Sequence, residues 1–220
     1  LLHRHLGTTL LTLQQLQQSL GRLRRSQPEL PCPDDRSIPW RFSADGRCLQ
    51  LNTNTPRPWF HALANAQGYG AFANNQGAVY SFCGNSQQNA ITPFSPVLDS
   101  VTPPGQAWYF WNMDTDEPLL RLPLTLGDGV GADEGLLSEF RPGSVRYSAR
   151  RCDFVVEMDV FTLPEQAAEG RLLTLRNAGR QTLRLRVSAC LQLVLAELPE
   201  DSRGSLKVHW DATQNAFFAE

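Results

Sequence analysis

The sequence has few of the features that mark membrane-spanning, disulfide-rich or metal-binding proteins. No apolar run approaches the roughly 20 residues that a helix needs to cross a bilayer. The five cysteines are scattered without any Cys-x-x-Cys spacing, and the four histidines do not cluster. This pattern favours neither a disulfide scaffold nor a zinc site. We therefore expect a reducing, cytoplasmic environment, no metal and no cofactor held by this chain.

Lysine is nearly absent, because Lys207 is the single lysine and the other basic residues are arginines. The 20 basic and 22 acidic residues leave a formal net charge of −2, so the chain lacks the basic surface of nucleic-acid-binding proteins. Apolar residues make up 41% and charged residues 19%, which suffices for a core and excludes a disordered chain. We expect no nucleic-acid partner.

The sequence also lacks the familiar catalytic signatures. It has no Gly-x-Ser-x-Gly elbow, no phosphate-binding glycine loop followed by Lys-Ser/Thr, and no His-Glu-x-x-His. Asp114 and Asp116 begin an acidic segment that ends at Glu139, but the spacing of a calcium loop is not continued. We interpret this segment as a solvated loop, with a site of paired carboxylates as the alternative. Asp153 and Glu157 are predicted to lie at the surface.

A helix is predicted at the beginning of the chain, over residues 1–27. Leucines recur there at the spacing of one helical face: Leu6, Leu10, Leu13, Leu16, Leu20 and Leu23. Prolines within residues 28–37 then end the helix and form a connector. The helix is expected to pack on a neighbouring domain or to join two domains, and binding to a membrane surface is the alternative. Because the chain begins at Leu1 without a methionine, we expect a piece of a longer polypeptide.

From Ile38 onwards the apolar residues recur at every second position, which is typical of strands with one buried face. The longest alternation covers residues 183–195, and shorter ones cover 154–160 and 122–126. Such strands, separated by turn signals, favour antiparallel sheets packed face to face. We predict one mainly β domain over residues 38–220, a large antiparallel sandwich of two sheets.

Two hairpins are predicted within this domain. The polar turn at 177–180 would join the strand that holds Leu173 and Leu175 to the strand over 183–195. The second hairpin would pair the strand that begins at Val208 with Phe217 and Phe218.

Aromatic residues are concentrated in one part of the sequence. More than half of them lie within residues 59–111, where several Asn and Gln residues also occur. Aromatic rings can stack on the flat faces of sugars, and amides can bind sugar hydroxyls. This composition makes sugar binding one hypothesis, and the filling of a sandwich core is the alternative.

Short segments in a fixed order carry a resemblance to a known family. Those in the first half are Thr55–Trp59, Leu63–Asn65, Gly77–Ser81 and Gly84–Phe94, and those in the second half are Pro103–Ala107, Asp114–Asp116, Arg141–Tyr147, Leu175–Asn177 and Val208–Asp211. Together they resemble the N-terminal module of the inverting phosphorylases that act on cellobiose, chitobiose and β-1,2-glucooligosaccharides. The likeness is strongest to the corresponding module of cyclic β-1,2-glucan synthases.

The resemblance implies a galactose-mutarotase-like β-supersandwich from about Ile38, and it leaves open whether the chain includes the last strands. In the family, a helical linker and an (α/α)6 barrel follow the sandwich. The barrel carries the aspartate that acts as general acid and the pocket for inorganic phosphate, which attacks the anomeric carbon. No catalytic residue is therefore expected here, and inorganic phosphate is expected only as a co-substrate of the parent enzyme.

The resemblance also suggests residues that would line the mouth of the neighbouring active site. They are Arg57, Asn85, Gln87, Gln88, Asn89 and Trp111. Relatives usually carry Asn-Ser-Arg-Glu-Asn where this chain carries Gln87 and Gln88, so two charges are replaced by neutral amides. The implied partners are a β-glucan oligosaccharide, the missing barrel and a second copy of the chain. The implied location is the cytoplasm or the cytoplasmic portion of a membrane-bound synthase.

Three functions are weighed on these grounds. The first is an accessory sandwich module of a β-glucoside phosphorylase or glucan synthase, which shapes the active-site mouth and the subunit interface without chemistry of its own. The second is an independent carbohydrate-binding module for β-glucans. The third is an interaction sandwich of immunoglobulin type, which the ordered segments and the lack of a Cys…Trp…Cys core disfavour.

Overall fold

The computed structural model describes residues 40–52, 55, 58–86, 89–94, 105–123, 136–196 and 204–220. All regular elements in these ranges are strands, and the mainly β prediction is confirmed. The helix predicted over residues 1–27 and the connector over 28–37 lie outside the described residues. Within the described part, no helix with the length and apolarity of a membrane span is found.

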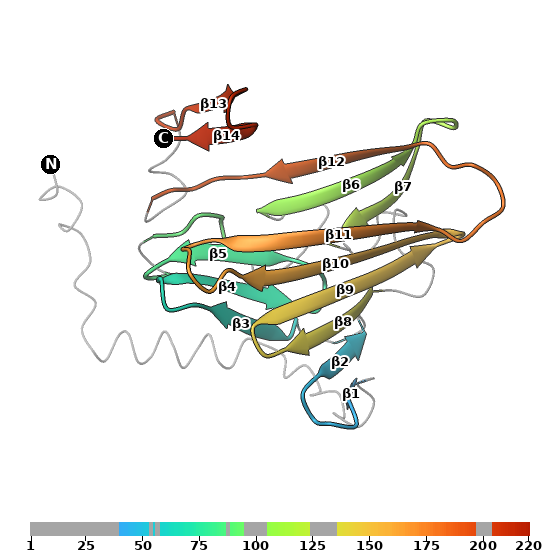
Figure 1. The fold of residues 1–220 in the computed structure, drawn as a ribbon, viewed down its shortest axis with the longest axis horizontal. Helices are drawn as coiled ribbons and strands as arrows, with labels where there is room; N and C mark the ends of the chain where they lie inside the picture. The colour runs from blue at the N-terminus through green and yellow to red at the C-terminus, as the bar shows by residue number, and fades with distance from the viewer. Residues whose placement is uncertain are drawn as a thin grey trace, which may run out of the picture. The chain divides into compact units, whose positions relative to one another are not determined.

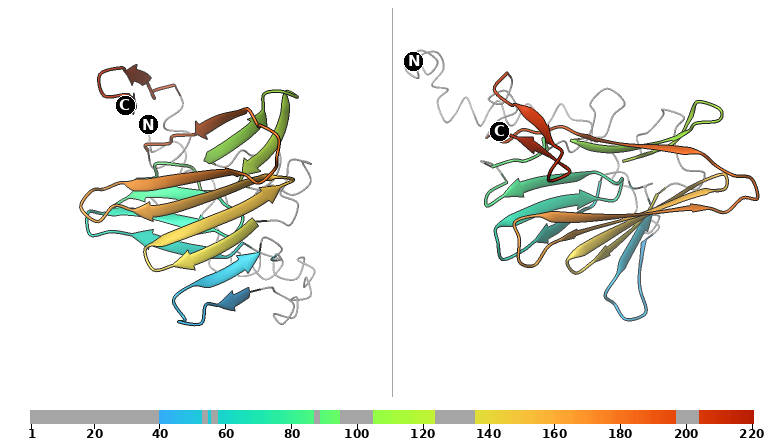
Figure 2. Two further views of the ribbon diagram at one scale, coloured as in Figure 1. Left: turned by 45° about the vertical axis from the view of Figure 1, so that its right-hand side comes forward. Right: turned by 45° about the horizontal axis from the view of Figure 1, so that its top comes forward.

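One layer of the domain is a six-stranded antiparallel sheet (Figures 1 and 2). Its spatial order is β1-β2-β8-β9-β10-β11. The strands are β1 (Trp40–Phe42), β2 (Leu49–Asn52), β8 (Leu136–Arg141), β9 (Ser144–Arg151), β10 (Phe154–Thr162) and β11 (Glu169–Asn177). The three longest, β9 to β11, follow one another in sequence and in space, so short turns connect them.

The second layer consists of two three-stranded antiparallel sheets. One has the order β3-β4-β5, with β3 (Phe60–Ala64), β4 (Tyr69–Asn74) and β5 (Val79–Cys83). The other has the order β12-β6-β7, with β6 (Gln106–Asn112), β7 (Glu117–Leu122) and β12 (Leu185–Leu191). Isolated bridges from Ala90 to Phe82 and to Ala196 connect the two sheets. The predicted two-sheet sandwich is thus a two-layer sandwich with a divided second layer.

The hydrophobic core lies between the two layers and shows why the alternating pattern forms strands. In β10 the side chains of Phe154, Val156, Met158 and Val160 are buried, whereas the residues between them face outward. The same core cluster contains Phe110 of β6 and residues of the β3-β4-β5 sheet. Since side chains alternate between the two faces of a strand, each strand needs only one apolar face to contribute side chains to the core between the layers.

Polar side chains also tie the two layers together. The buried Tyr147 hydroxyl of β9 donates to the Asn74 carbonyl over 2.8 Å, and the Ser138 hydroxyl of β8 donates to the Asn75 carbonyl over 3.1 Å. These bonds give two backbone oxygens at the end of β4 a side-chain donor from the facing layer.

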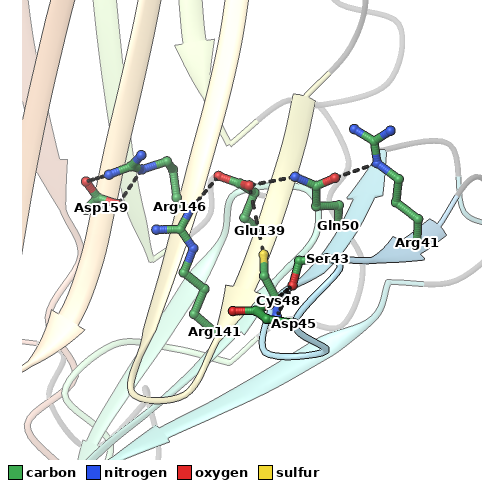
Figure 3. Close-up of polar contacts among 9 residues, drawn as sticks. All are labelled: Arg41, Ser43, Asp45, Cys48, Gln50, Glu139, Arg141, Arg146 and Asp159. Carbon is green, nitrogen blue, oxygen red and sulfur yellow. Dashed lines mark hydrogen bonds and ion pairs between the residues drawn. The ribbon is translucent and has the colours of Figure 1, made fainter.

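The outer face of the six-stranded sheet is polar, as expected for a solvated face. Successive cross-strand partners from β1 to β10 form a row of polar and charged side chains across this face. Figure 3 shows the row, which consists of Arg41, Gln50, Glu139, Arg146 and Asp159. Gln50 donates to Glu139 over 2.7 Å, and Arg146 binds both carboxylate oxygens of Asp159 at 2.7 and 2.8 Å. Oppositely charged partners on neighbouring strands favour this register.

One predicted hairpin is confirmed and the other is wrong. The strands β13 (Val208–Asp211) and β14 (Ala216–Ala219) pair as predicted, with Trp210 opposite Phe217. The strands β11 and β12 do not pair with each other, because β11 pairs with β10 and β12 pairs with β6. The turn after Asn177 therefore carries the chain from one layer to the other. A turn signal shows where a strand ends, but it does not decide which strand becomes the partner.

Candidate functional site

The outer face of the β3-β4-β5 sheet carries an aromatic patch, which we define as Phe60, Phe72, Tyr80, Phe82 and Phe94. The first four lie on three adjacent strands and share this face because Phe72 is the register partner of Tyr80 and of Ala62. Phe94 follows in the segment after β5 and lies over the sheet. Its side chain is 57% exposed, and that of Phe60 is 40% exposed. The patch thus presents apolar rings to solvent.

The rings of the patch contact one another in tilted and edge-on arrangements. The centroid of Phe94 lies 4.9 Å from that of Tyr80 and 5.8 Å from that of Phe60. The Phe72 and Phe82 centroids are 5.3 Å apart. These are favourable geometries for aromatic pairs, so the cluster supports its own exposed rings. Burial raises the pKa of Tyr80 to about 12, so its hydroxyl stays protonated.

A glycine makes room for part of the patch. Gly70 of β4 is the register partner of Phe82, whose ring covers it. A Cβ at Gly70 would lie 2.3 Å from the Phe82 ring, so only glycine fits beneath it. The packing of Phe82 therefore depends on the absence of a side chain at this position.

A small pocket lies at one side of the patch. Its volume is about 220 Å³, and its aromatic lining comes from Phe72, Tyr80, Phe82 and Phe94. Ser86 and Thr92 add hydroxyl groups. Both belong to the segment from Gly84 to Thr92, whose described residues, 84–86 and 89–92, we call the amide loop. The pocket therefore joins apolar rings to polar side chains of the neighbouring loop.

The structure places two of the predicted mouth residues in this amide loop. The Cys83 N–H donates to the Asn89 carbonyl over 3.0 Å, and the Asn89 N–H donates to the Asn85 carbonyl over 2.9 Å. This local ladder holds the loop against the end of β5, and both asparagines are exposed. The predicted residues Gln87, Gln88 and Arg57 lie outside the described residues.

Trp111 does not join this group. It lies on β6, where its register partners are Arg186 and Pro118. Gln106 at the start of β6 contacts Ser81 of β5. Trp111 is five residues further along β6 than Gln106. With a strand rise of about 3.3 Å per residue, it lies roughly 17 Å along the strand from that contact. The sequence proximity of the aromatic residues thus corresponds to two separate places in the fold.

The acidic segment is described only at its ends. Asp114 accepts a hydrogen bond from Arg184 over 3.2 Å in the turn between β6 and β7. Asp128, Asp133 and Glu134 lie outside the described residues, so the alternative of paired carboxylates stays open. Among the described residues no group of three or more His, Cys, Asp or Glu side chains could hold a metal ion.

The structure reveals a polar cluster that the sequence analysis missed, formed by Tyr69, Ser81, Gln106, Glu169 and Arg171 between the two layers. Glu169 accepts hydrogen bonds from the Tyr69 hydroxyl at 2.6 Å and the Ser81 hydroxyl at 3.0 Å. Gln106 donates to Ser81 over 3.1 Å, and Arg171 Nε donates to Glu169 over 2.8 Å. Burial and the adjacent carboxylate raise the pKa of Tyr69 above its usual range.

No local sequence signal could have shown this cluster. Its members come from β4, β5, β6 and β11, and Tyr69 and Glu169 are 100 residues apart. Glu169 and Arg171 occupy alternate positions of one strand, which reveals a shared face but not its surroundings.

These features define an antiparallel β-sandwich with an aromatic and amide-rich outer face. Residues 48–220 match the family model of the glycosyl hydrolase 94 supersandwich domain. Because the match covers most of the chain, the protein belongs to this family and is an accessory β-sandwich domain of a carbohydrate-active enzyme of the glycosyl hydrolase 94 type. A search of curated proteins found no match.

Proposed function

We propose that this chain is the sandwich module of an inverting β-glucoside phosphorylase or a cyclic β-1,2-glucan synthase. In this proposal the chain performs no chemistry. The general acid and the site for inorganic phosphate belong to an (α/α)6 barrel elsewhere in a longer parent protein. The family match over residues 48–220 supports the proposal, because it assigns the chain to the supersandwich domain of glycosyl hydrolase 94 enzymes.

The aromatic patch and the amide loop are the surface that would face the active-site mouth. The patch exposes apolar rings, and contiguous exposed apolar surface on a folded domain commonly marks an interaction site. The adjacent Asn85 and Asn89 can donate and accept hydrogen bonds with sugar hydroxyls. Together these groups could contact both a neighbouring protein surface and an oligosaccharide.

The absence of chemistry in this chain is tested with inorganic phosphate and soluble β-glucans. The 220-residue chain should release no glucose 1-phosphate, whereas the product of the complete reading frame should release it or cyclise the glucan. Release of glucose 1-phosphate by the purified 220-residue chain would overturn the assignment of chemistry to another domain.

The role of the amide loop is tested in the complete enzyme. Asn85→Ala and Asn89→Ala should raise KM for the glucan about three- to tenfold, the effect expected for losing one hydrogen bond. Gln181→Ala is the matched control, because its exposed amide lies in the connection between β11 and β12. An equal KM in all variants would show that the amide loop does not contact the glucan at the active-site mouth.

A second function is supported by the exposure of Phe60 and Phe94. An independent carbohydrate-binding module uses exposed rings as platforms for sugars. In that case calorimetry should detect binding of a soluble β-glucan by the chain alone, and Phe94→Ala should weaken it. Trp111→Ala tests the other aromatic position. No heat with any β-glucan would leave the accessory role alone.

The expected assembly and location complete the proposal. We expect a homodimer in which sandwich loops contribute to the subunit interface, and sedimentation analysis of the complete enzyme tests this. We also expect a cytoplasmic location or the cytoplasmic part of a membrane-bound synthase. No disulfide joins any two of the four described cysteines, which is compatible with a reducing compartment.

A further inference from the structure

We propose that the polar cluster forms the floor of a second binding site, inside the sandwich, for a neutral polyhydroxylated molecule of monosaccharide size. The cavity above the cluster has a volume of about 310 Å³. It lies between the layers, with β11 on one side and β4, β5, β6 and β12 on the other. This site is separate from the aromatic patch, which lies on the outer face of the β3-β4-β5 sheet.

The first observation is a guanidinium nitrogen at the cavity whose hydrogen-bonding capacity is not filled. Arg171 lines the cavity, and its side chain is only 12% exposed. Its Nη2 atom is shielded from solvent and forms an ion pair with Glu169 over 2.7 Å, but this contact lacks the geometry of a hydrogen bond. Buried donors are nearly always satisfied, so an unsatisfied guanidinium nitrogen beside a cavity points to a missing acceptor. A hydroxyl group of a ligand would supply that acceptor.

The second observation is the charge balance of the floor. Glu169 and Arg171 form an ion pair, so the cavity presents one negative and one positive group together. An anionic ligand would be repelled by Glu169, and a cationic ligand would be repelled by Arg171. A hydroxyl can donate to the carboxylate and accept from the guanidinium at the same time. The pair therefore selects for neutral molecules that carry several hydroxyls.

The third observation is the shape and lining of the cavity walls. Trp108, Ile91 and Leu191 provide apolar surface beside the polar floor. An indole ring can cover the C–H face of a sugar ring. Leu191 is 57% exposed, so the cavity opens to solvent at this edge. The volume lies at the lower end of ligand pockets, about 300–1,000 Å³, which suits a single sugar unit better than an oligosaccharide.

This inference goes beyond the proposed function. Only the choice of a sugar as the probe rests on the proposed function. D-glucose and methyl β-D-glucoside are titrated into the 220-residue chain and followed by calorimetry and by saturation-transfer NMR. We expect saturable binding with Kd on the order of millimolar, which is ordinary for a ligand with so few atoms. Inorganic phosphate at the same concentration should not bind or compete.

Variants locate the binding in the cavity. Arg171→Lys keeps the positive charge beside Glu169 but removes the guanidinium Nη2 donor, so affinity should fall about three- to tenfold. Arg146→Lys is the matched control, because Arg146 pairs with Asp159 on the outer face of the six-stranded sheet. Trp108→Phe should abolish any fluorescence change caused by the sugar. Thermal unfolding of each variant checks that the fold is retained.

The outcomes separate this inference from the proposed function. Binding that Arg171→Lys weakens and Arg146→Lys leaves unchanged supports the internal site. Absence of saturable binding, equal effects of the two variants, or competition by phosphate would overturn it. If the complete enzyme is active on β-glucans but the 220-residue chain binds no glucose, the internal site is disproved and the proposed function still holds.

Discussion

The middle of the sandwich and its β11–β12 edge carry the same alternating pattern but differ in burial. In β10 every second side chain from Phe154 to Val160 is buried. In β12 only Leu185 of the inner face packs partly buried against the core, whereas Val187 is 38% and Leu191 57% exposed. Val187 is nevertheless the register partner of Phe110, which is fully buried. Alternation therefore decides which side chains share a face, and the opposing layer decides whether that face is covered.

The edge also differs from the middle in its chemistry. The middle is filled by apolar side chains and two cross-layer hydroxyls, whereas the edge holds the ion pair of Glu169 and Arg171 beside a cavity. Within the described residues, β11 is the last strand of its sheet. Incomplete coverage by a second layer leaves room there for water or a ligand, and polar groups tolerate such a place better than apolar ones.

The largest expected effect tests this contrast on one pair of neighbouring residues. Phe110→Ala should destabilise the chain by about 3–5 kcal/mol, because it leaves a cavity in the covered core. Val187→Ala, at the directly opposite position, should cost less than about 1 kcal/mol, since its side chain is already partly hydrated. Urea unfolding monitored by circular dichroism measures both. Equal losses would show that the edge is covered in solution.

An intermediate effect is expected at the outer face of the second layer. Gly70→Ala should destabilise by about 1–3 kcal/mol, because the new methyl group would overlap the Phe82 ring. The double variant Gly70→Ala with Phe82→Leu should recover part of this loss, which the same unfolding assay would detect. If Phe82→Leu gives no recovery, the cost has a cause other than this contact.

The smallest effect concerns the β13–β14 hairpin, whose Phe217 is 73% exposed. The Asp211 carboxylate accepts hydrogen bonds from the Thr213 hydroxyl at 2.6 Å and from two backbone N–H groups, which lower its pKa. Because the pKa of Asp211 is lower in the folded chain, its ionised carboxylate stabilises the turn at pH values above the unfolded-state pKa of about 3.9. This stabilisation is lost as the pH falls through the folded-state pKa. An NMR titration of Asp211 should give a midpoint below that value.

Thr213→Val provides the control for this titration. It removes the hydroxyl donor and should move the midpoint of Asp211 upward. An unchanged midpoint would show that the backbone donors alone lower the pKa.

Local patterns predicted much of the fold. The alternation in β10 and the pairing of β13 with β14 were visible in the sequence, because both depend on residues close together in the chain. The pairing of β11 was predicted wrongly, since partner choice depends on which inner face meets which layer. Asn85 and Asn89 lie in one loop, as their spacing suggests, whereas Trp111 lies elsewhere.

The sequence by itself determined that residues from about Ile38 form strands with one apolar face and that the chain resembles the sandwich modules of β-glucan enzymes. Only the tertiary structure decided that the second layer is divided, that five rings gather on one outer face, and that Tyr69 meets Glu169 between the layers. The physical reason is the sequence separation of the residues that interact. Side-chain alternation is a property of a single strand, whereas burial and hydrogen bonding across layers arise only when strands far apart in sequence pack together.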